Sequence, residues 1–152
     1  MNGIDEKLVA EIVKKVLMEH VSKKGCCGIE KVKAKSGITG IKGSTVKCES
    51  FDTGKPGDKV YLKDILTLDE NRNLACGFME MEESEFDWTL DYDEVDYVIE
   101  GTLEIKTEGE KIAGNAGDVI MIPKGSSISF STPGHVKFFY VTYPANWSEV
   151  TK

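Results

Sequence analysis

From residue 29 onward the chain is a succession of short β-rich segments separated by turn residues, and this feature constrains its fold most. Clusters of glycine, proline, aspartate and asparagine interrupt the segments, as in residues 52–58 and 69–73. About nine or ten strands are expected, with no further helical pattern among them. The sequence therefore predicts an all-β fold, either a sandwich or a barrel.

Composition and charge limit the partners of such a domain. A length of 152 residues, with 40% hydrophobic and 30% charged residues, fits one globular domain with a short appendage. A net charge of -7 argues against nucleic acid or an anionic membrane as partner. We find no membrane-spanning run, no signal peptide and no disulfide framework among the four cysteines. A reduced cytoplasmic protein is expected.

Residues 4–21 have the pattern of an amphipathic helix. Apolar residues recur at every fourth position: Ile4, Leu8, Ile12 and Val16. Glycines at positions 25 and 28 then end the pattern. We therefore expect a helix and linker in residues 1–25 and a β domain in residues 29–150. The helix either packs on its own domain or is a detachable recognition helix that becomes fully ordered in a partner's groove.

Residues 94–100 are predicted to form a strand with two different faces. One face carries Val95, Tyr97 and Ile99, and the other carries Glu94, Asp96, Val98 and Glu100. Because residues two apart share a face, the Glu94 and Asp96 side chains point to the same side. On an exposed face two such acids are ordinary, whereas inside a barrel they would form a site. Periodicity alone does not choose between these alternatives.

Two motifs identify the barrel more closely. The first runs from Trp88 to Gly101 and places Glu94 seven residues before that glycine. The second, Gly117-Asp-Val-Ile-Met-Ile-Pro-Lys-Gly125, has the spacing glycine, five residues, proline, one residue, glycine. Together they resemble the double signature of a cupin, and with Tyr143-Pro-Ala-Asn-Trp they closely resemble the ethanolamine-utilisation cupins of the EutQ family. The resemblance covers roughly residues 44–150. It implies a cupin barrel (double-stranded β-helix, or jelly roll), here with an N-terminal amphipathic helix.

The chain departs from metal-binding cupins at the ligand positions. The first two expected histidines fall among residues 87–90 and the third falls on Ile128, and none of these is histidine. Only Glu94 of the expected ligand set is present. Transition metals prefer imidazole or thiolate donors, so no transition metal is expected. A site in which Glu94 and Asp96 hold Mg²⁺ together with substrate phosphate oxygens stays open.

Four residues are the candidates for catalysis: Glu94, Asp96, Tyr92 and Lys124. Two acids confined in one cavity repel each other, so at least one should have a raised pKa, pair with a cation or bind metal. Lys124, in the corner loop, would attract an anionic substrate, and Tyr92 adds a phenol. Such a set would support phosphoryl transfer by positioning and charge neutralisation. Alternatively, the acids bind only water or a buried basic partner.

The resemblance also implies a biological role. It points to ethanolamine utilisation in or beside a bacterial microcompartment, and to a Mg²⁺-dependent acetate kinase that interconverts acetyl phosphate and ADP with acetate and ATP. It further implies that the helix at residues 4–21 is similar to encapsulation peptides and binds shell proteins. Val95, Tyr97 and Ile99 face away from the candidate site and are expected to pack against a second sheet or a partner subunit. Cupins commonly pair through such surfaces, so the resemblance implies a homodimer. A non-catalytic scaffold and a metabolite-binding cupin stay open as alternatives.

Overall fold

The computed structural model describes residues 28–147, which fall into two units divided after Thr45. In the first unit, β1 (Lys31–Lys33) and β2 (Thr39–Ile41) form an antiparallel hairpin, followed by the 3-10 helix η1 (Gly43–Thr45). Residues 28–45 thus group apart from the barrel, although the sequence suggested one domain from residue 29. The amphipathic helix expected at residues 4–21 lies outside the described residues.

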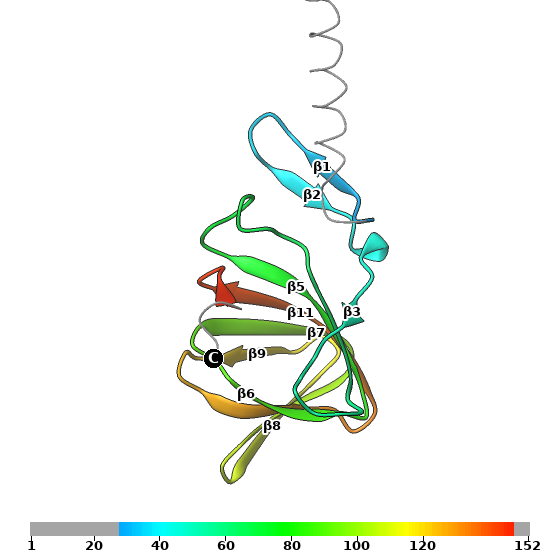
Figure 1. Cartoon of the computed structure of the whole chain (residues 1–152), viewed down its shortest axis with the longest axis vertical. Coiled ribbons are helices and arrows are strands. Elements are labelled where there is room, and N and C mark those ends of the chain that lie inside the picture. Colours follow the sequence, from blue (N-terminus) through cyan, green and yellow to red (C-terminus); the bar gives the residue numbers. More distant parts are fainter. Residues whose placement is uncertain (1–27, 148–152) are drawn as a thin grey trace, which may run out of the picture. The chain divides into compact units, whose positions relative to one another are not determined.

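The second unit is a single antiparallel sheet of nine strands, which curls on itself. Its order is β3-β4-β5-β11-β7-β10-β6, and β8 and β9 also pair with β7. In Figure 1, β5, β11, β7 and β9 lie side by side, and β6 and β8 lie across the interior from β5. The strands are β3 (Glu49–Ser50), β4 (Lys59–Asp64), β5 (Ala75–Glu82), β6 (Glu85–Thr89), β7 (Asp93–Thr107), β8 (Glu110–Asn115), β9 (Val119–Ile122), β10 (Ser127–Ser131) and β11 (His135–Tyr143). The prediction of an all-β barrel is confirmed. Within residues 28–147 no helix has the length and apolar character needed to cross a bilayer.

The central strand of this sheet is β7, which pairs with four other strands. Its first half pairs with β9 and β11, and its second half pairs with β8 and β10. A glycine between two β-rich segments commonly marks a turn, but the strand continues through Gly101. Gly101 has φ of 74°, and an added Cβ would overlap the carbonyl oxygen of His135. Glycine therefore bends the strand without ending it, because hydrogen bonds continue on both sides.

The core lies on the inner face of the curled sheet, where side chains of alternating residues meet. Along β7 the predicted alternation is confirmed: Glu94 and Asp96 are 6% and 0% exposed, whereas Val95 and Tyr97 are 41% and 45% exposed. The register against β11 shifts near Ile99, which explains why the alternation ends there. Most fully buried are the apolar residues Val60, Met81, Leu90, Val98, Leu103, Val136 and Phe138.

Replacing Gly101 by alanine should destabilise the barrel by about 3 kcal/mol or more, because the new Cβ combines a left-handed backbone with a clash against β11. Gly109 is the matched control, since it has φ of 87° but open space around the added Cβ. Gly109→Ala should cost only about 1–2 kcal/mol. Urea denaturation measures both losses, and equal losses would contradict the role given to the contact at Gly101.

Candidate functional site

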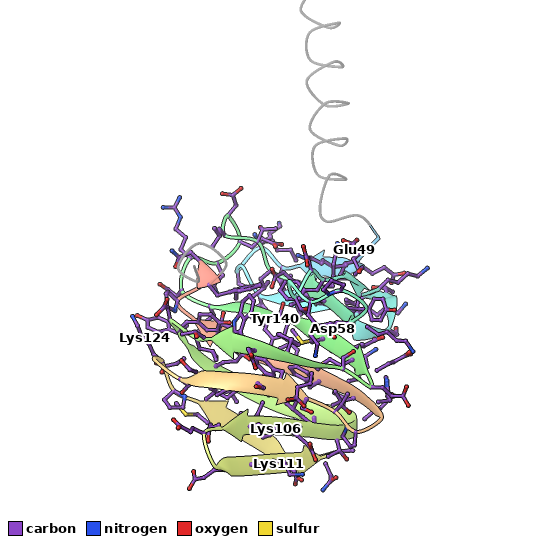
Figure 2. The ribbon with its side chains drawn as sticks, turned by 60° about the horizontal axis from the view of Figure 1, so that its bottom comes forward. Glu49, Asp58, Lys106, Lys111, Lys124 and Tyr140 are labelled. Carbon is purple, nitrogen blue, oxygen red and sulfur yellow. The ribbon has the colours of Figure 1, made fainter. Side chains whose placement is uncertain are left out.

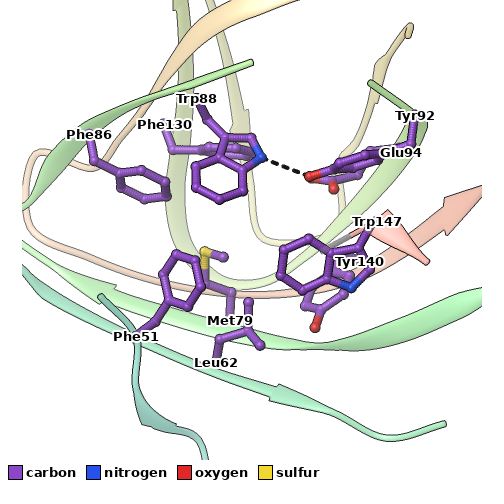
Figure 3. Close-up of a pocket in the computed structure, with 10 residues that line it drawn as sticks. All are labelled: Phe51, Leu62, Met79, Phe86, Trp88, Tyr92, Glu94, Phe130, Tyr140 and Trp147. Carbon is purple, nitrogen blue, oxygen red and sulfur yellow. Dashed lines mark hydrogen bonds between the residues drawn. The ribbon is translucent and has the colours of Figure 1, made fainter. Parts of the chain in front are cut away.

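The barrel interior contains a narrow pocket whose walls are mainly aromatic. Its free volume is about 20 Å³, which is room for about one water molecule. Of the ten described residues that line it, Glu94 is the one carboxyl and none is a lysine, arginine or histidine. Figure 3 shows the full lining: Phe51, Leu62, Met79, Phe86, Trp88, Tyr92, Glu94, Phe130, Tyr140 and Trp147.

Tyr92 is held in the pocket by a tryptophan of the neighbouring strand β6. Trp88 Nε1 donates a hydrogen bond of 2.8 Å to the Tyr92 hydroxyl, drawn as the dashed line in Figure 3. The Tyr92 ring also packs edge-on against Trp147, with centroids 6.1 Å apart. Burial, followed by the charge of Glu94, raises the pKa of Tyr92. The phenol therefore stays protonated at neutral pH and acts as a hydrogen-bond donor rather than a base.

Glu94 and Asp96 form a buried carboxyl pair on the inner face of β7. Neither Asp96 oxygen accepts a hydrogen bond from the part of the chain that the structure describes. Burial raises the pKa of Glu94 to about 7. Burial and then the charge of Glu94 raise the pKa of Asp96 well above its usual range. The pair therefore holds at least one proton at neutral pH and can donate or accept a proton near pH 7.

A second polar group faces the pocket and was not found from the sequence. The Tyr140 hydroxyl, on β11, donates a hydrogen bond of 2.6 Å to Asp64 Oδ1 on β4. Burial raises the pKa of Asp64, while hydrogen bonds with Tyr140 and Trp147 oppose the shift. A Cβ at Gly77 would overlap the Tyr140 hydroxyl, so only glycine on the intervening strand β5 lets this bond form. The glycine between Ala75 and Met79 on the inner face of β5 was the one sequence signal of this contact.

Of the four candidate residues, the structure brings together Tyr92, Glu94 and Asp96 but not Lys124. Lys124 is exposed at the corner between β9 and β10, and its side chain does not line the pocket. Figure 2 places it at the periphery of the barrel. Its backbone N–H donates 2.8 Å to the Asp93 carboxylate, which ties the corner to the start of β7. Lys124 thus has a structural contact, and the pocket obtains no positive charge from it.

Magnesium does not fit the carboxyl pair in this geometry. Glu94 and Asp96 offer the oxygen donors that Mg²⁺ prefers, but Mg²⁺ keeps an octahedral shell that contains several waters. The adjoining free space holds about one water. Among residues 28–147 no group of three or more histidine, cysteine, aspartate or glutamate side chains is placed to hold a metal ion. At a position where metal-binding cupins carry a histidine, Ile128 is buried instead.

A curled antiparallel sheet that encloses a small pocket on its inner face is the cupin fold. The structure of the Clostridium difficile EutQ protein superimposes with a TM-score of 0.79 and 52% identity, covering 82% of this chain and 93% of that one. The model of the family described as ethanolamine utilisation protein EutQ matches residues 4–149. The chain belongs to this family, and the resemblance seen in its motifs is confirmed.

Two relatives support membership of this family at the level of sequence. The acetate kinase EutQ of Clostridioides difficile (strain 630) is 48% identical over 152 residues, which is 97% of each chain. The acetate kinase EutQ of Escherichia coli (strain K12) is 45% identical over 148 residues, 95% of this chain but 63% of that protein. The chain therefore matches the Clostridioides difficile relative over nearly the whole length of both proteins. It matches slightly less than two thirds of the Escherichia coli relative.

The buried pair predicts that the protein becomes less stable as pH rises. The folded pKa of Glu94, about 7, lies above its ordinary value of 4.5, so the unfolded chain loses this proton first. The free energy of unfolding, measured by urea denaturation, should fall between about pH 4.5 and pH 7 by a few kcal/mol.

Asp96→Asn removes one of the two like charges and should make this decline shallower. At pH 7.5 it should raise the free energy of unfolding by about 1–3 kcal/mol. Asp91→Asn is the control, because Asp91 is exposed just before the same strand. An identical pH dependence in wild type and Asp96→Asn would contradict the coupling of the two carboxyls.

Proposed function

We propose that this protein is an acetate kinase of ethanolamine utilisation, which interconverts acetyl phosphate and ADP with acetate and ATP. The observation that carries the proposal is the relative named acetate kinase EutQ, which is 48% identical over 97% of both chains. The pocket contributes a size limit, because its free volume of about 20 Å³ excludes a nucleotide. Only the carbonyl oxygen of the acyl group would enter it, since the free space holds about one water, and the phosphates would stay outside.

The residues at the pocket have defined tasks in this proposal. Protonated Glu94, with its pKa of about 7, would donate a hydrogen bond to an oxygen of the acyl group. Tyr92 would position the acyl group as a second donor, and the aromatic walls would exclude water. Asp96 would lie behind Glu94 and make no contact with the substrate. Catalysis would then rest on positioning and charge neutralisation, as is usual for phosphoryl transfer.

The purified full-length protein, prepared from a host that lacks its own acetate kinase, should form ATP from acetyl phosphate and ADP with MgCl₂ present. Glu94→Ala should lower kcat/KM by roughly 10²- to 10⁴-fold, because it removes the hydrogen-bond donor at the acyl group. Glu100→Ala is the control, since Glu100 lies exposed on the same strand. Failure of the wild type to form ATP would contradict the proposal and favour a scaffold or a metabolite-binding cupin.

We also propose that the protein works in the cytoplasm, in or beside a bacterial microcompartment, with residues 4–21 as the segment that binds shell proteins. Two observations support this: the amphipathic pattern of the segment and membership of the ethanolamine-utilisation family. An amphipathic helix of this length would gain most of its stability from burying its apolar stripe in a groove.

Deleting residues 1–25 should abolish entry into microcompartments and leave the barrel folded. Ile12→Glu, on the apolar stripe, should reduce entry strongly, whereas Lys14→Glu on the polar side serves as the matched control. Co-purification with shells, or fluorescence microscopy of a C-terminal fusion, measures the effect. Normal entry of the truncated protein would rule out this role of the segment.

A homodimer through the outer face of the sheet is the third part of the proposal. Val95 pairs with Met121 and Tyr97 pairs with Val119 across β7 and β9, and all four are at least 41% exposed. On the other side of β7, Val141 and Phe139 extend the same two rows. Such a contiguous apolar surface suits an isologous contact with a second copy.

Tyr97→Asp should convert the dimer into a monomer, because it places a charge at the centre of this apolar surface. Light scattering after size exclusion measures the mass. Leu68→Asp is the control, since Leu68 is 44% exposed in the loop between β4 and β5, outside the surface. A wild-type protein that runs as a monomer at micromolar concentration would contradict the dimer.

A further inference from the structure

The polar atoms around Glu94 have more acceptors than donors. Asp96 Oδ1 and Oδ2 and Thr142 Oγ1 are buried without a hydrogen-bond partner in the described part of the chain. Thr142 lies directly opposite Glu94 in the register of β7 and β11. The Trp88 indole and the Tyr140 hydroxyl already donate to Tyr92 and Asp64. Among residues 28–147, the donors left near the pair are the Tyr92 and Thr142 hydroxyls and the proton of the pair itself, and they are fewer than the lone pairs of the four carboxyl oxygens. Since buried polar atoms are nearly always paired, this cluster has the composition of a site whose ligand supplies donors.

The charged side chains around the pocket also favour a positively charged ligand. Asp64, Glu94 and Asp96 are three acids on the inner side of the barrel, and no cationic side chain lines the pocket among residues 28–147. Lys63, next to Asp64 in the chain, forms an ion pair of 2.7 Å with Glu49. An anionic ligand would meet mainly acids and ring faces here. A cation would gain from both, because the faces of aromatic rings attract positive charge.

We propose that the recess beside Glu94 binds an ammonium group, either the free ammonium ion or the –NH₃⁺ head of a small primary alkylammonium ion. An ammonium group is about as large as the water that the recess has room for, and it brings several donors to a cluster rich in acceptors. A metal ion would need oxygen ligands on several sides, whereas here rings form most of the wall. Glu94 contacts the ligand, and Asp96 and Thr142 lie behind it.

This binding goes beyond the proposed kinase activity and does not require it. A positive group at Glu94 would also reduce the repulsion between the carboxyl pair and an anionic substrate at the pocket entrance. The binding test below contains neither acyl phosphate nor nucleotide. A failed kinase assay therefore leaves the ammonium site standing, and absent binding leaves the kinase proposal standing.

The two tryptophans of the chain both line the pocket, so intrinsic fluorescence reports its occupancy directly. The full-length protein is titrated at pH 8 with ammonium chloride and with ethylammonium chloride. Sodium chloride controls for ionic strength, and ethanol is the neutral counterpart of ethylammonium. A saturable change with an apparent affinity at least about tenfold tighter than for either control is expected.

If only ammonium chloride gives this response, the ligand is the free ammonium ion. If ethylammonium chloride gives it, the ligand is the head of a primary alkylammonium ion. Responses equal to those of sodium chloride or ethanol, or no response, overturn the proposal.

A variant that lacks the negative charge of Glu94 provides the second test. Glu94→Gln keeps the shape of the side chain and should weaken binding at least about tenfold, while Glu100→Gln should leave it unchanged. Circular dichroism verifies that both variants are folded. Unchanged ethylammonium affinity in folded Glu94→Gln overturns the assignment to this recess.

Protonation of the carboxyl pair also removes negative charge, so it should weaken binding as Glu94→Gln does. Lowering the pH from 8 to 5.5 should weaken binding in the wild type and have a smaller effect in Glu94→Gln. The titratable groups that face the pair among the described residues are Asp64 on β4, Tyr92 before β7 and Tyr140 on β11. Of these, only the acids change charge in this range, and Asp64→Asn separates its contribution from that of Glu94. Affinity that does not depend on pH overturns the proposal.

Discussion

The pairing of β7 with four neighbours is the constraint on which the rest of this barrel depends. One strand contributes its first half to the wall that carries Glu94 and Asp96, and its second half to the opposite wall. Both halves stay hydrogen-bonded only because Gly101 bends without a side chain against His135. Burial of the acid pair is therefore a consequence of sheet closure. The side chains of residues 94 and 96 point to the inner face of β7, and closure of the sheet covers that face.

Closure also determines the chemistry of the pocket. Water is excluded by aromatic rings, which lowers the local dielectric and raises the pKa values of Glu94, Asp96 and Tyr92 together. Such groups exchange protons or donate hydrogen bonds near neutral pH instead of acting as permanent charges. Within residues 28–147 the Asp96 oxygens have no hydrogen-bond partner, which is one reason for proposing a small ligand that brings its own donors.

Several features of the fold could be predicted from local patterns. The alternation along residues 94–98 placed the inner residues of β7 correctly. This pattern depends only on the two-residue period of a strand. Two features could not be predicted in this way: β7 continues through Gly101, and Lys124, expected to attract the substrate, does not line the pocket. Both depend on which distant segment lies opposite, namely β11 for Gly101 and the start of β7 for Lys124.

By itself, the sequence determined that this is an all-β cupin of the ethanolamine-utilisation family, that the usual histidine ligands are missing, and that two acids share one strand face. These properties are local, because they follow from residue identity and spacing. Only the tertiary structure decided that the acids are buried, that Lys124 lies outside the pocket, and that Asp64 and Tyr140 join it. Residues 76 positions apart meet through the pairing of β4, β5 and β11, and no local pattern encodes such a contact.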